Sequence, residues 1–398
     1  MTDYLIVGNG AAGTYAAEAI RKQDANGRIT ILTDEDLPFY YRIQLNEYIS
    51  GDQKEEDLVA KKPQWYEDQK IDLKISTAIT GADPEKKILI TSDNQEFAYD
   101  RLLLATGSHA FVPPIKGSDK SGVFSLRSIQ DARDISKWAQ NVEKVVLIGG
   151  GLLGLEAGNA LRKLGKQVMV VEFFPRLLPR QLDVDGAERL QKTMEGMGFS
   201  FRLGAKTQEI SGEGKADGVL LEGGETLPAD MVVISAGVRP NLELSEPLGL
   251  KHDKGIQVDD HLKTNRMDIY AAGDVAEFRG MPYGIWPAAM EQGKIAGTNM
   301  AGGELRYDGT TMANSLKVVG VDLASAGNID ADTELDFRVF TDGDVYKKIV
   351  LENNRIVGCI MLGDVAGFNQ VTKAMGEKMD VSQLKDEIFS EGFDFKRL

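Results

Sequence analysis

Two glycine-rich segments with the same spacing constrain this chain more than any other feature. Residues 8–13 read Gly-Asn-Gly-Ala-Ala-Gly and residues 149–154 read Gly-Gly-Gly-Leu-Leu-Gly, so both fit G-x-G-x-x-G. Each follows a short apolar run, at residues 4–7 and 144–148, and opens a stretch with helical spacing. In such a strand, turn and helix the first glycine makes the turn, the second admits a pyrophosphate, and the third packs helix on strand. The pattern therefore predicts two dinucleotide-binding units.

Acidic residues follow each segment where a carboxylate can accept hydrogen bonds from a ribose. They are Asp34 and Glu35 in the first unit and Glu172 in the second. An acid at Glu172 accepts from a free 2′-hydroxyl and repels a 2′-phosphate, which favours NADH over NADPH. The glycine-segment residues expected to bind the dinucleotides are Gly8, Gly10, Ala12, Gly13, Gly149, Gly151 and Gly154.

The order of the predicted strands divides the 398 residues into three domains, since the chain exceeds what one hydrophobic core organises. The run from Ile269 to Asp274 is expected to return to the first sheet, followed by a helix from about Pro287 to Met300. We therefore expect an α/β fold with two Rossmann-like domains, one inserted in the other, and a C-terminal α+β domain with an antiparallel sheet. The expected bounds are 1–111 with 242–306, then 112–241, and finally 307–398.

Composition excludes several classes of function. Asp and Glu outnumber Lys and Arg by 61 to 46, a net charge of −15, so nucleic acid is an unfavourable partner. No apolar run approaches the roughly 18 residues of a membrane span and no secretory leader precedes Tyr4, so we expect a cytoplasmic protein without a membrane anchor.

The single cysteine, Cys359, lies in an apolar run and is expected to be a small buried side chain. One cysteine and three scattered histidines predict no metal site.

Five segments together make the chain resemble the pyridine-nucleotide-disulfide oxidoreductase superfamily over essentially its whole length. They are the two glycine segments, Ala105-Thr106-Gly107, Ser235 to Asn241, and Tyr270 to Asp274. The resemblance implies FAD at the first glycine segment and NAD(H) at the second. It assigns Asp274 to the ribityl and pyrophosphate part of FAD and the backbone at Ile79 to adenine. The segments at the flavin and nicotinamide are expected to contribute Ala105, Thr106, Gly107 and Gly237.

The same resemblance places two catalytic candidates, Glu156 and Arg42, near the meeting point of nicotinamide and flavin. The stretch from Trp286 to Gly293 resembles the helix start that faces the flavin pyrimidine ring. Backbone N–H groups and the helix dipole there stabilise negative charge on the reduced ring. Trp286 itself either covers the ring or anchors a domain interface.

The segment that distinguishes branches of this superfamily contains no sulfur. Disulfide reductases carry a cysteine pair just after the second FAD strand, and NADH oxidases, peroxidases and coenzyme A disulfide reductases carry one cysteine there. This chain reads Pro38 to Glu47 without any, which excludes thiol relay chemistry. The segment resembles instead the branch of NADH:rubredoxin reductases and the flavin subunits of assimilatory nitrite reductases.

A flavin converts the hydride of NADH into the single electrons that iron-sulfur and rubredoxin centres accept. The hypothesis is therefore an FAD-dependent NADH oxidoreductase that reduces a small redox protein of the rubredoxin or ferredoxin type. Two alternatives stay open: an NADH oxidase or diaphorase that reduces oxygen directly, and the flavin subunit of a nitrite-reductase-like complex. Related enzymes often dimerise through the C-terminal domain, which makes a homodimer one candidate state.

Overall fold

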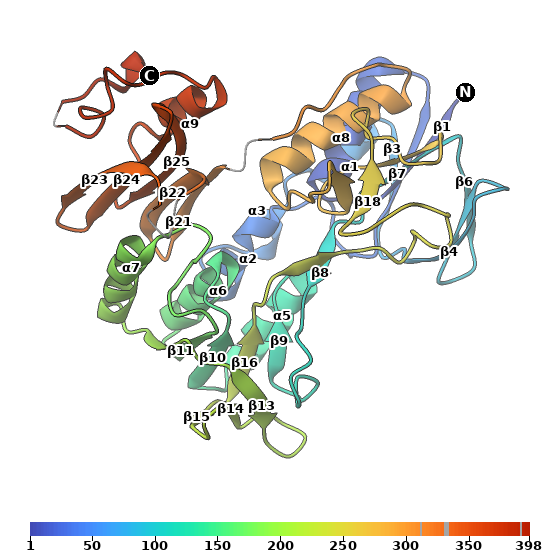
Figure 1. Cartoon of the computed structure of the whole chain (residues 1–398). Coiled ribbons are helices and arrows are strands. Elements are labelled where there is room, and N and C mark those ends of the chain that lie inside the picture. The colour runs from blue at the N-terminus through green and yellow to red at the C-terminus, as the bar shows by residue number, and fades with distance from the viewer. Residues whose placement is uncertain (311–312, 330–333, 391) are drawn as a thin grey trace. The chain divides into compact units, whose positions relative to one another are not determined.

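The chain forms two compact units that interleave along the sequence (Figure 1). The computed structural model describes residues 1–310, 313–329, 334–390 and 392–398. The first unit comprises Met1–Phe111, Arg127–Ile129 and Val238–Thr310, and the second comprises Val112–Leu126, Gln130–Gly237 and Thr311–Leu398. The residues outside the described ranges all fall in the predicted C-terminal domain, 307–398. The three-domain division stays a prediction.

A parallel sheet in the order β19-β7-β1-β2-β3 is the centre of the first unit. Its strands are β1 (Asp3–Val7), β2 (Arg28–Leu32), β3 (Ile71–Lys74), β7 (Arg101–Leu104) and β19 (Ile269–Ala271). β19 pairs in parallel with β7, with Ile269 opposite Leu102, which confirms the predicted return of the chain to its first sheet. Strands β1 and β7 are nearly continuous apolar runs because parallel strands are covered on both faces.

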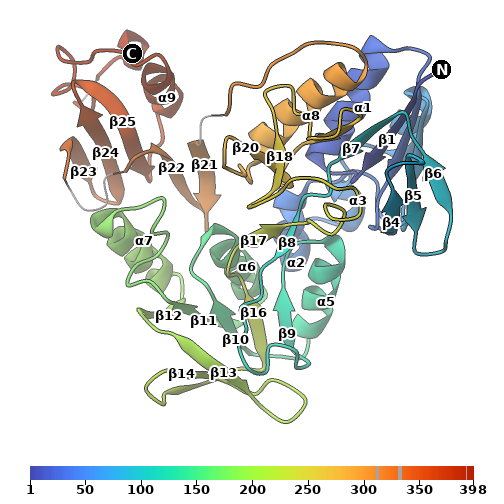
Figure 2. The same ribbon diagram turned by 45° about the vertical axis from the view of Figure 1, so that its right-hand side comes forward.

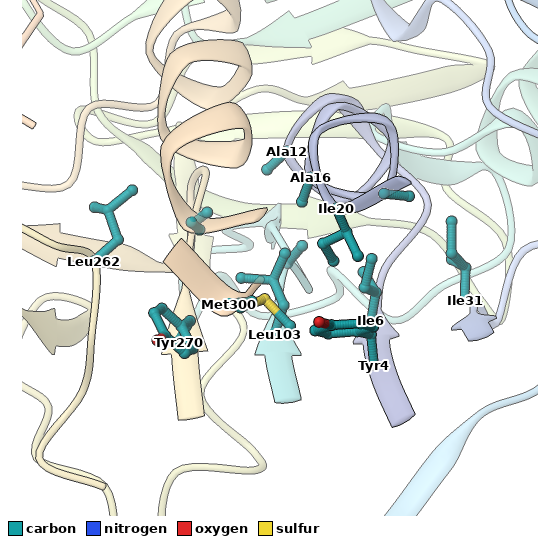
Figure 3. Close-up of a cluster of buried hydrophobic side chains, with 14 of the residues drawn as sticks. Tyr4, Ile6, Ala12, Ala16, Ile20, Ile31, Leu103, Leu262, Tyr270 and Met300 are labelled. Carbon is teal, nitrogen blue, oxygen red and sulfur yellow. The ribbon is translucent and has the colours of Figure 1, made fainter. Parts of the chain in front are cut away.

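Helices α1 (Ala11–Gln23) and α8 (Trp286–Met300) lie side by side against this sheet (Figures 1 and 3). Their backbones approach closely, since a Cβ at Gly293 would lie 2.2 Å from the carbonyl oxygen of Ala12. Likewise, a Cβ at Gly297 would lie 2.3 Å from the carbonyl oxygen of Ala16. Small residues therefore fix the distance between the two helices. The core beneath them is filled from adjacent strands by Ile6, Leu103 and Tyr270 (Figure 3).

Smaller elements complete the first unit. They are the sheet of β4 (Ile79–Asp83), β5 (Ile88–Thr91) and β6 (Glu96–Ala98), the pairs β8 (Ser108–Ala110) with β17 (Val238–Pro240) and β18 (Ile256–Val258) with β20 (Ala276–Phe278), and the helices α2 (Leu45–Ser50), α3 (Glu55–Leu58) and α4 (Pro63–Asp68). Strands β5 and β6 form an antiparallel hairpin. The β8 and β17 pair, where the chain leaves and re-enters this unit, was not predicted.

The second unit contains another parallel sheet, in the order β12-β11-β10-β16-β9. Its strands are β9 (Val123–Ser125), β10 (Lys144–Ile148), β11 (Gln167–Glu172), β12 (Ser200–Leu203) and β16 (Met231–Ile234). The accompanying elements are the helices α5 (Ile129–Ala139), α6 (Leu152–Lys163) and α7 (Val184–Gly196), and the small antiparallel sheet of β13 (Thr207–Ser211), β14 (Gly218–Leu221) and β15 (Thr226–Pro228). The repeat of strand, glycine turn and helix confirms the second Rossmann-like unit.

The C-terminal part of the second unit is an antiparallel sheet in the order β21-β22-β25-β24-β23 (Figure 2). Its elements are β21 (Ala313–Val318), β22 (Val321–Gly327), β23 (Asp336–Asp342), β24 (Val345–Glu352), β25 (Arg355–Leu362) and α9 (Phe368–Gly376). Strands β23 to β25 confirm the predicted antiparallel run, whereas β21 and β22 were not predicted. The fold class is thus the predicted one. No helix among the described residues is both long and apolar enough to cross a membrane.

Candidate dinucleotide sites

The first glycine turn connects β1 to α1, and two of its glycines are required by the protein itself. Gly8 has φ +105°, and a Cβ there would lie 2.1 Å from the carbonyl oxygen of Ala105. A Cβ at Gly13 would lie 1.9 Å from the carbonyl oxygen of Gly8. Around Gly10 a Cβ would meet nothing within 4 Å, and its φ of −82° suits any residue. Internal packing therefore does not explain the glycine at Gly10, whereas an approaching pyrophosphate does.

The second glycine turn, from β10 to α6, likewise has a glycine that packing requires and a glycine with open space around it. Gly149 has φ +115°, and its Cβ would lie 2.2 Å from the carbonyl oxygen of Ser235. A Cβ at Gly151 again meets nothing within 4 Å. Gly151 is also the N-cap residue of α6, and no side chain caps that helix end. Free backbone N–H groups and the helix dipole make both helix starts suited to phosphate.

The acid of the second unit, Glu172, is hydrogen-bonded to the backbone of the glycine turn. Oε2 of Glu172 accepts a hydrogen bond from the Gly150 N–H at 2.5 Å, and Oε1 accepts from the Phe174 N–H at 2.8 Å. The residue is 7% exposed. Its negative charge is thus held at a fixed position beside the turn.

A pocket opens beside the first glycine turn. Its lining residues are Asn9, Gly10, Ala11, Thr33, Glu35, Leu37, Pro38, Phe39, Tyr40, Arg42 and Trp286. The structure thus brings four predicted residues together: Gly10, Glu35, Arg42 and Trp286. Asn9, which was not predicted, accepts a hydrogen bond at Oδ1 from the Tyr66 hydroxyl at 3.1 Å. Its buried Nδ2 has no hydrogen-bond partner among the described residues, so a donor is left for a bound group.

Arg42 and Glu35 form an ion pair at the pocket wall. The second nitrogen of the Arg42 guanidinium donates to the Tyr40 hydroxyl at 3.0 Å and to the Arg127 carbonyl oxygen at 2.9 Å. The Tyr40 hydroxyl in turn donates to Oε2 of Glu35 at 2.5 Å. Burial raises the pKa of Tyr40, so this side chain stays a neutral donor. Of the two predicted acids, Glu35 is therefore engaged by an ion pair and a hydrogen bond within the protein, whereas Asp34 is exposed.

Asp274, just after β19, is held by a residue that sequence reasoning missed. Its Oδ2 accepts hydrogen bonds from the Arg127 guanidinium at 2.7 Å and from the Ser108 hydroxyl at 2.8 Å. Arg127 also donates to the Ser108 carbonyl oxygen at 2.9 Å. Arg127 lies 147 positions from Asp274, and no local pattern around it indicates a site.

Glu156 and Trp286, the residues expected near the nicotinamide and the flavin, belong to different units. Oε1 of Glu156, on α6, accepts a hydrogen bond from the Val319 N–H at 2.8 Å. Val319 is a buried valine with φ +56°, a conformation that β-branched residues rarely adopt. Trp286 begins α8 and stacks on Phe39, with ring centroids 5.6 Å apart. The catalytic roles of Glu156 and Arg42 stay predictions.

The remaining predicted residues lie at strand ends and turns. Thr106 follows β7, and its carbonyl oxygen accepts a hydrogen bond from Nδ2 of Asn241 at 2.7 Å. Gly237, with φ +99°, immediately precedes β17. Ala12 is buried between α1 and α8. Ile79 begins β4 and is half-buried. Their contacts with a cofactor stay predictions.

Cys359, in β25, is fully buried, as expected from its apolar run. Burial raises the pKa of its thiol to about 12, so the thiolate required for redox chemistry is not formed at neutral pH. Among the described residues, no group of three or more His, Cys, Asp or Glu side chains is arranged to hold a metal ion.

Comparison with known families agrees with this geometry. Residues 2–293 match the family model described as pyridine nucleotide-disulphide oxidoreductase. The chain belongs to this family. Residues 313–379 match the model of the rubredoxin NAD+ reductase C-terminal domain. The resemblance of the sequence to the superfamily and to its rubredoxin reductase branch is therefore confirmed.

Relatives within this oxidoreductase family differ in length. The nitrite reductase [NAD(P)H] of Bacillus subtilis is 38% identical over 95% of this chain and 48% of its own length. The NADH-rubredoxin oxidoreductase of Clostridium acetobutylicum is 32% identical over 98% of this chain and 97% of its own. The solved putidaredoxin reductase–putidaredoxin complex aligns with a TM-score of 0.88 and 25% identity, over 97% of this chain and 96% of that one. The chain thus spans about half the length of the nitrite reductases that it matches.

Proteins of this oxidoreductase family are flavin-dependent and use NAD(P)H. The two glycine turns fit these groups, because the space at Gly10 and Gly151 is left open by the protein. The unpaired Nδ2 of Asn9 in the first pocket fits as well. The segment from Pro38 to Glu47, where disulfide reductases carry cysteines, has none.

Proposed function

We propose that this chain is an FAD-dependent NADH oxidoreductase that passes electrons singly to a small redox protein of the rubredoxin or ferredoxin type. The observation that carries the proposal is the pair of open glycine turns in a chain whose only cysteine is buried in the C-terminal sheet. Electrons that enter at one dinucleotide have no thiol to leave through. A bound FAD would accept a hydride and release single electrons.

The first unit would hold FAD, and its own contacts prepare the site. The start of α1 would offer backbone N–H groups to the pyrophosphate, and Asp274, held by Arg127, would face the ribityl chain. Asp34 would take the adenosine ribose, since both carboxylate oxygens of Glu35 already accept from Arg42 and Tyr40. The uncapped N-terminus of α8, with Trp286 as its first residue, would stabilise negative charge on the flavin.

The second unit would hold NADH rather than NADPH. Glu172 supports this preference because its carboxylate is buried and tied to the glycine turn. A 2′-phosphate placed there would meet a negative charge that cannot turn away. Arg176 would not compensate, since its guanidinium donates to the carbonyl oxygens of Leu182 and Pro179 instead.

The work of the protein would be positioning. Glu156 is oriented by the Val319 N–H, so its carboxylate would present a fixed acceptor to the nicotinamide carboxamide. Neither Glu156 nor Arg42 is required to transfer a proton in this scheme. Bringing the hydride-donating carbon of the nicotinamide to the accepting atom of the flavin would supply the rate acceleration.

Stopped-flow reoxidation tests the proposal. The FAD-loaded chain is reduced anaerobically with NADH and then mixed with oxidised rubredoxin, with ferredoxin, or with air-saturated buffer. We expect reoxidation by one of the two proteins to be much faster than by air. Fast reaction with air that neither protein accelerates would show an NADH oxidase and contradict the proposal.

The length of the relatives favours one second candidate. Because the chain matches only about half of each nitrite reductase, it is alternatively the flavin-bearing part of such an assembly. In that case the chain would co-purify with a stoichiometric partner. Once separated from that partner, it would reduce every small carrier slowly. A homodimer stays a prediction.

A further inference from the structure

Strand β24 of the C-terminal sheet carries two neighbouring buried lysines with different partners. The Lys347 ammonium lies 2.6 Å from Oδ2 of Asp364, within the C-terminal part of the chain. The Lys348 ammonium lies 3.1 Å from Oδ2 of Asp183, at the start of α7. The Lys348 side chain is 1% exposed. Lys348 therefore joins the C-terminal sheet to the Rossmann-like part of the same unit through a fully buried ion pair.

Asp183 is held by three donors. Its Oδ1 accepts from the Gly186 N–H at 3.1 Å and so caps α7, while Oδ2 accepts from the Tyr346 hydroxyl at 2.7 Å as well as from Lys348. Asp183 is 5% exposed. A carboxylate buried to this extent needs its cation, because an unpaired buried charge is strongly unfavourable.

The segment 173–182 connects Glu172 to Asp183, and it packs against the second glycine turn. The Leu178 N–H donates to the carbonyl oxygen of Gly150 at 3.4 Å. Leu178 is fully buried with φ +48°, a strained conformation that surrounding contacts must maintain. Gly150 thus contacts both Glu172 at the start of this segment and Leu178 within it. The far end of the segment meets the C-terminal sheet and α7 through Asp183.

We propose that Lys348 is a positioning residue of the NADH site, acting through Asp183 on the segment 173–182 that supports Glu172 and Gly150. This inference rests on the proposed function, because it takes the second glycine turn as the NADH site. It gives the C-terminal domain a role in nucleotide binding. A purely structural role would lower stability without changing NADH affinity.

Lys348→Met tests this role directly, with Lys347→Met as the matched control. Lys347 is a buried lysine of the same strand that pairs with Asp364 instead of Asp183. The flavin of each FAD-loaded variant is reduced with increasing NADH in an anaerobic stopped-flow instrument. We expect Lys348→Met to raise the Kd for NADH about tenfold while the limiting rate and the FAD content stay unchanged. Lys347→Met is expected to leave the Kd unchanged even if its Tm falls.

Two further variants keep the test decisive. Tyr346→Phe removes one hydrogen bond to Asp183 and leaves the ion pair, so it should fold and raise the Kd by about threefold. Asp183→Asn combined with Lys348→Met removes both charges of this ion pair and should recover much of the lost affinity. If Lys348→Met does not fold, Tyr346→Phe decides the question.

Limited proteolysis gives a readout that does not depend on activity. Arg180 is an exposed trypsin site within the segment 173–182. We expect trypsin to cleave Lys348→Met after Arg180 faster than the wild type, and NAD+ to protect this variant less well. Lys347→Met should be cleaved at the wild-type rate, and NAD+ should protect it as well as it protects the wild type. Unchanged Kd and unchanged cleavage in Lys348→Met and Tyr346→Phe would overturn the inference. A wild-type chain whose flavin NADH does not reduce would instead overturn the proposed function.

Discussion

Oε2 of Glu172 accepts a hydrogen bond from the backbone N–H of Gly150, so the acid expected to select the nucleotide is hydrogen-bonded to the glycine turn that would bind it. This contact fixes the position of the carboxylate, and therefore of its negative charge, beside the turn. Glu172→Gln keeps one of the two acceptors and removes the charge, while its NH2 group faces the N–H of either Gly150 or Phe174.

Glu172→Gln should therefore weaken NADH binding by about 1.5–3 kcal/mol, the value of hydrogen bonds to a charged group. Discrimination against NADPH should fall as well, since the 2′-phosphate no longer meets a negative charge. The Kd of both nucleotides, measured by flavin reduction, checks this. Glu188→Gln, an exposed change on α7, is the control. An unchanged NADH to NADPH ratio in Glu172→Gln would contradict the assignment.

The two kinds of glycine in the second turn should respond differently to alanine. Gly151→Ala meets no protein atom, so it should keep the Tm and lose about 1–3 kcal/mol of NADH binding by occupying the ligand's space. Gly149→Ala combines φ +115° with a Cβ 2.2 Å from the Ser235 oxygen, so it should lower stability by at least about 1 kcal/mol. Thermal unfolding and NADH titration measure both. Unaltered NADH affinity in Gly151→Ala would show that no pyrophosphate binds there.

Arg127→Met should release FAD more readily. The change leaves the Asp274 carboxylate with the Ser108 hydroxyl but without its cation, and about 1.5–3 kcal/mol of FAD binding should be lost. The fluorescence of FAD freed on dilution measures the Kd. Lys137→Met, an exposed change on α5, should behave as the wild type. Equal FAD retention by both variants would show that Arg127 does not position Asp274.

Cys359 should be inert in the folded protein. With its pKa raised to about 12 by burial, only about one thiol in 10⁴ is ionised at pH 8, and a thiol reagent should react only after unfolding. Cys359→Ala should transfer electrons as fast as the wild type. Because the folded pKa lies above the unfolded value near 9, the thiol's contribution to stability is complete below pH 9 and is lost as the pH rises towards 12. Rapid labelling of the native protein, or loss of activity in Cys359→Ala, would contradict this account.

The strands at the two sites were predictable because they are local patterns. The run from Tyr4 to Val7 became β1 (Asp3–Val7), and the run from Lys144 to Ile148 became β10 with the same bounds. Both are continuous apolar segments ended by a glycine whose positive φ the turn requires.

The supporting residues were not predictable, because their contacts are distant in sequence. Arg127 reaches Asp274 across 147 positions, and Lys348 reaches Asp183 across 165. Neither has a spacing that indicates its partner. Arg42 is an intermediate case, because its place at the first pocket was expected. Its ion pair with Glu35 depends on side-chain geometry that the sequence does not reveal.

An anaerobic titration tests the central claim, that NADH electrons leave the flavin singly to a protein acceptor. One equivalent of NADH should bleach the flavin absorbance, and two equivalents of oxidised rubredoxin or ferredoxin should restore it. The claim would be contradicted if NADH failed to bleach the flavin, or if the reduced chain stayed bleached with both proteins and recovered only in air.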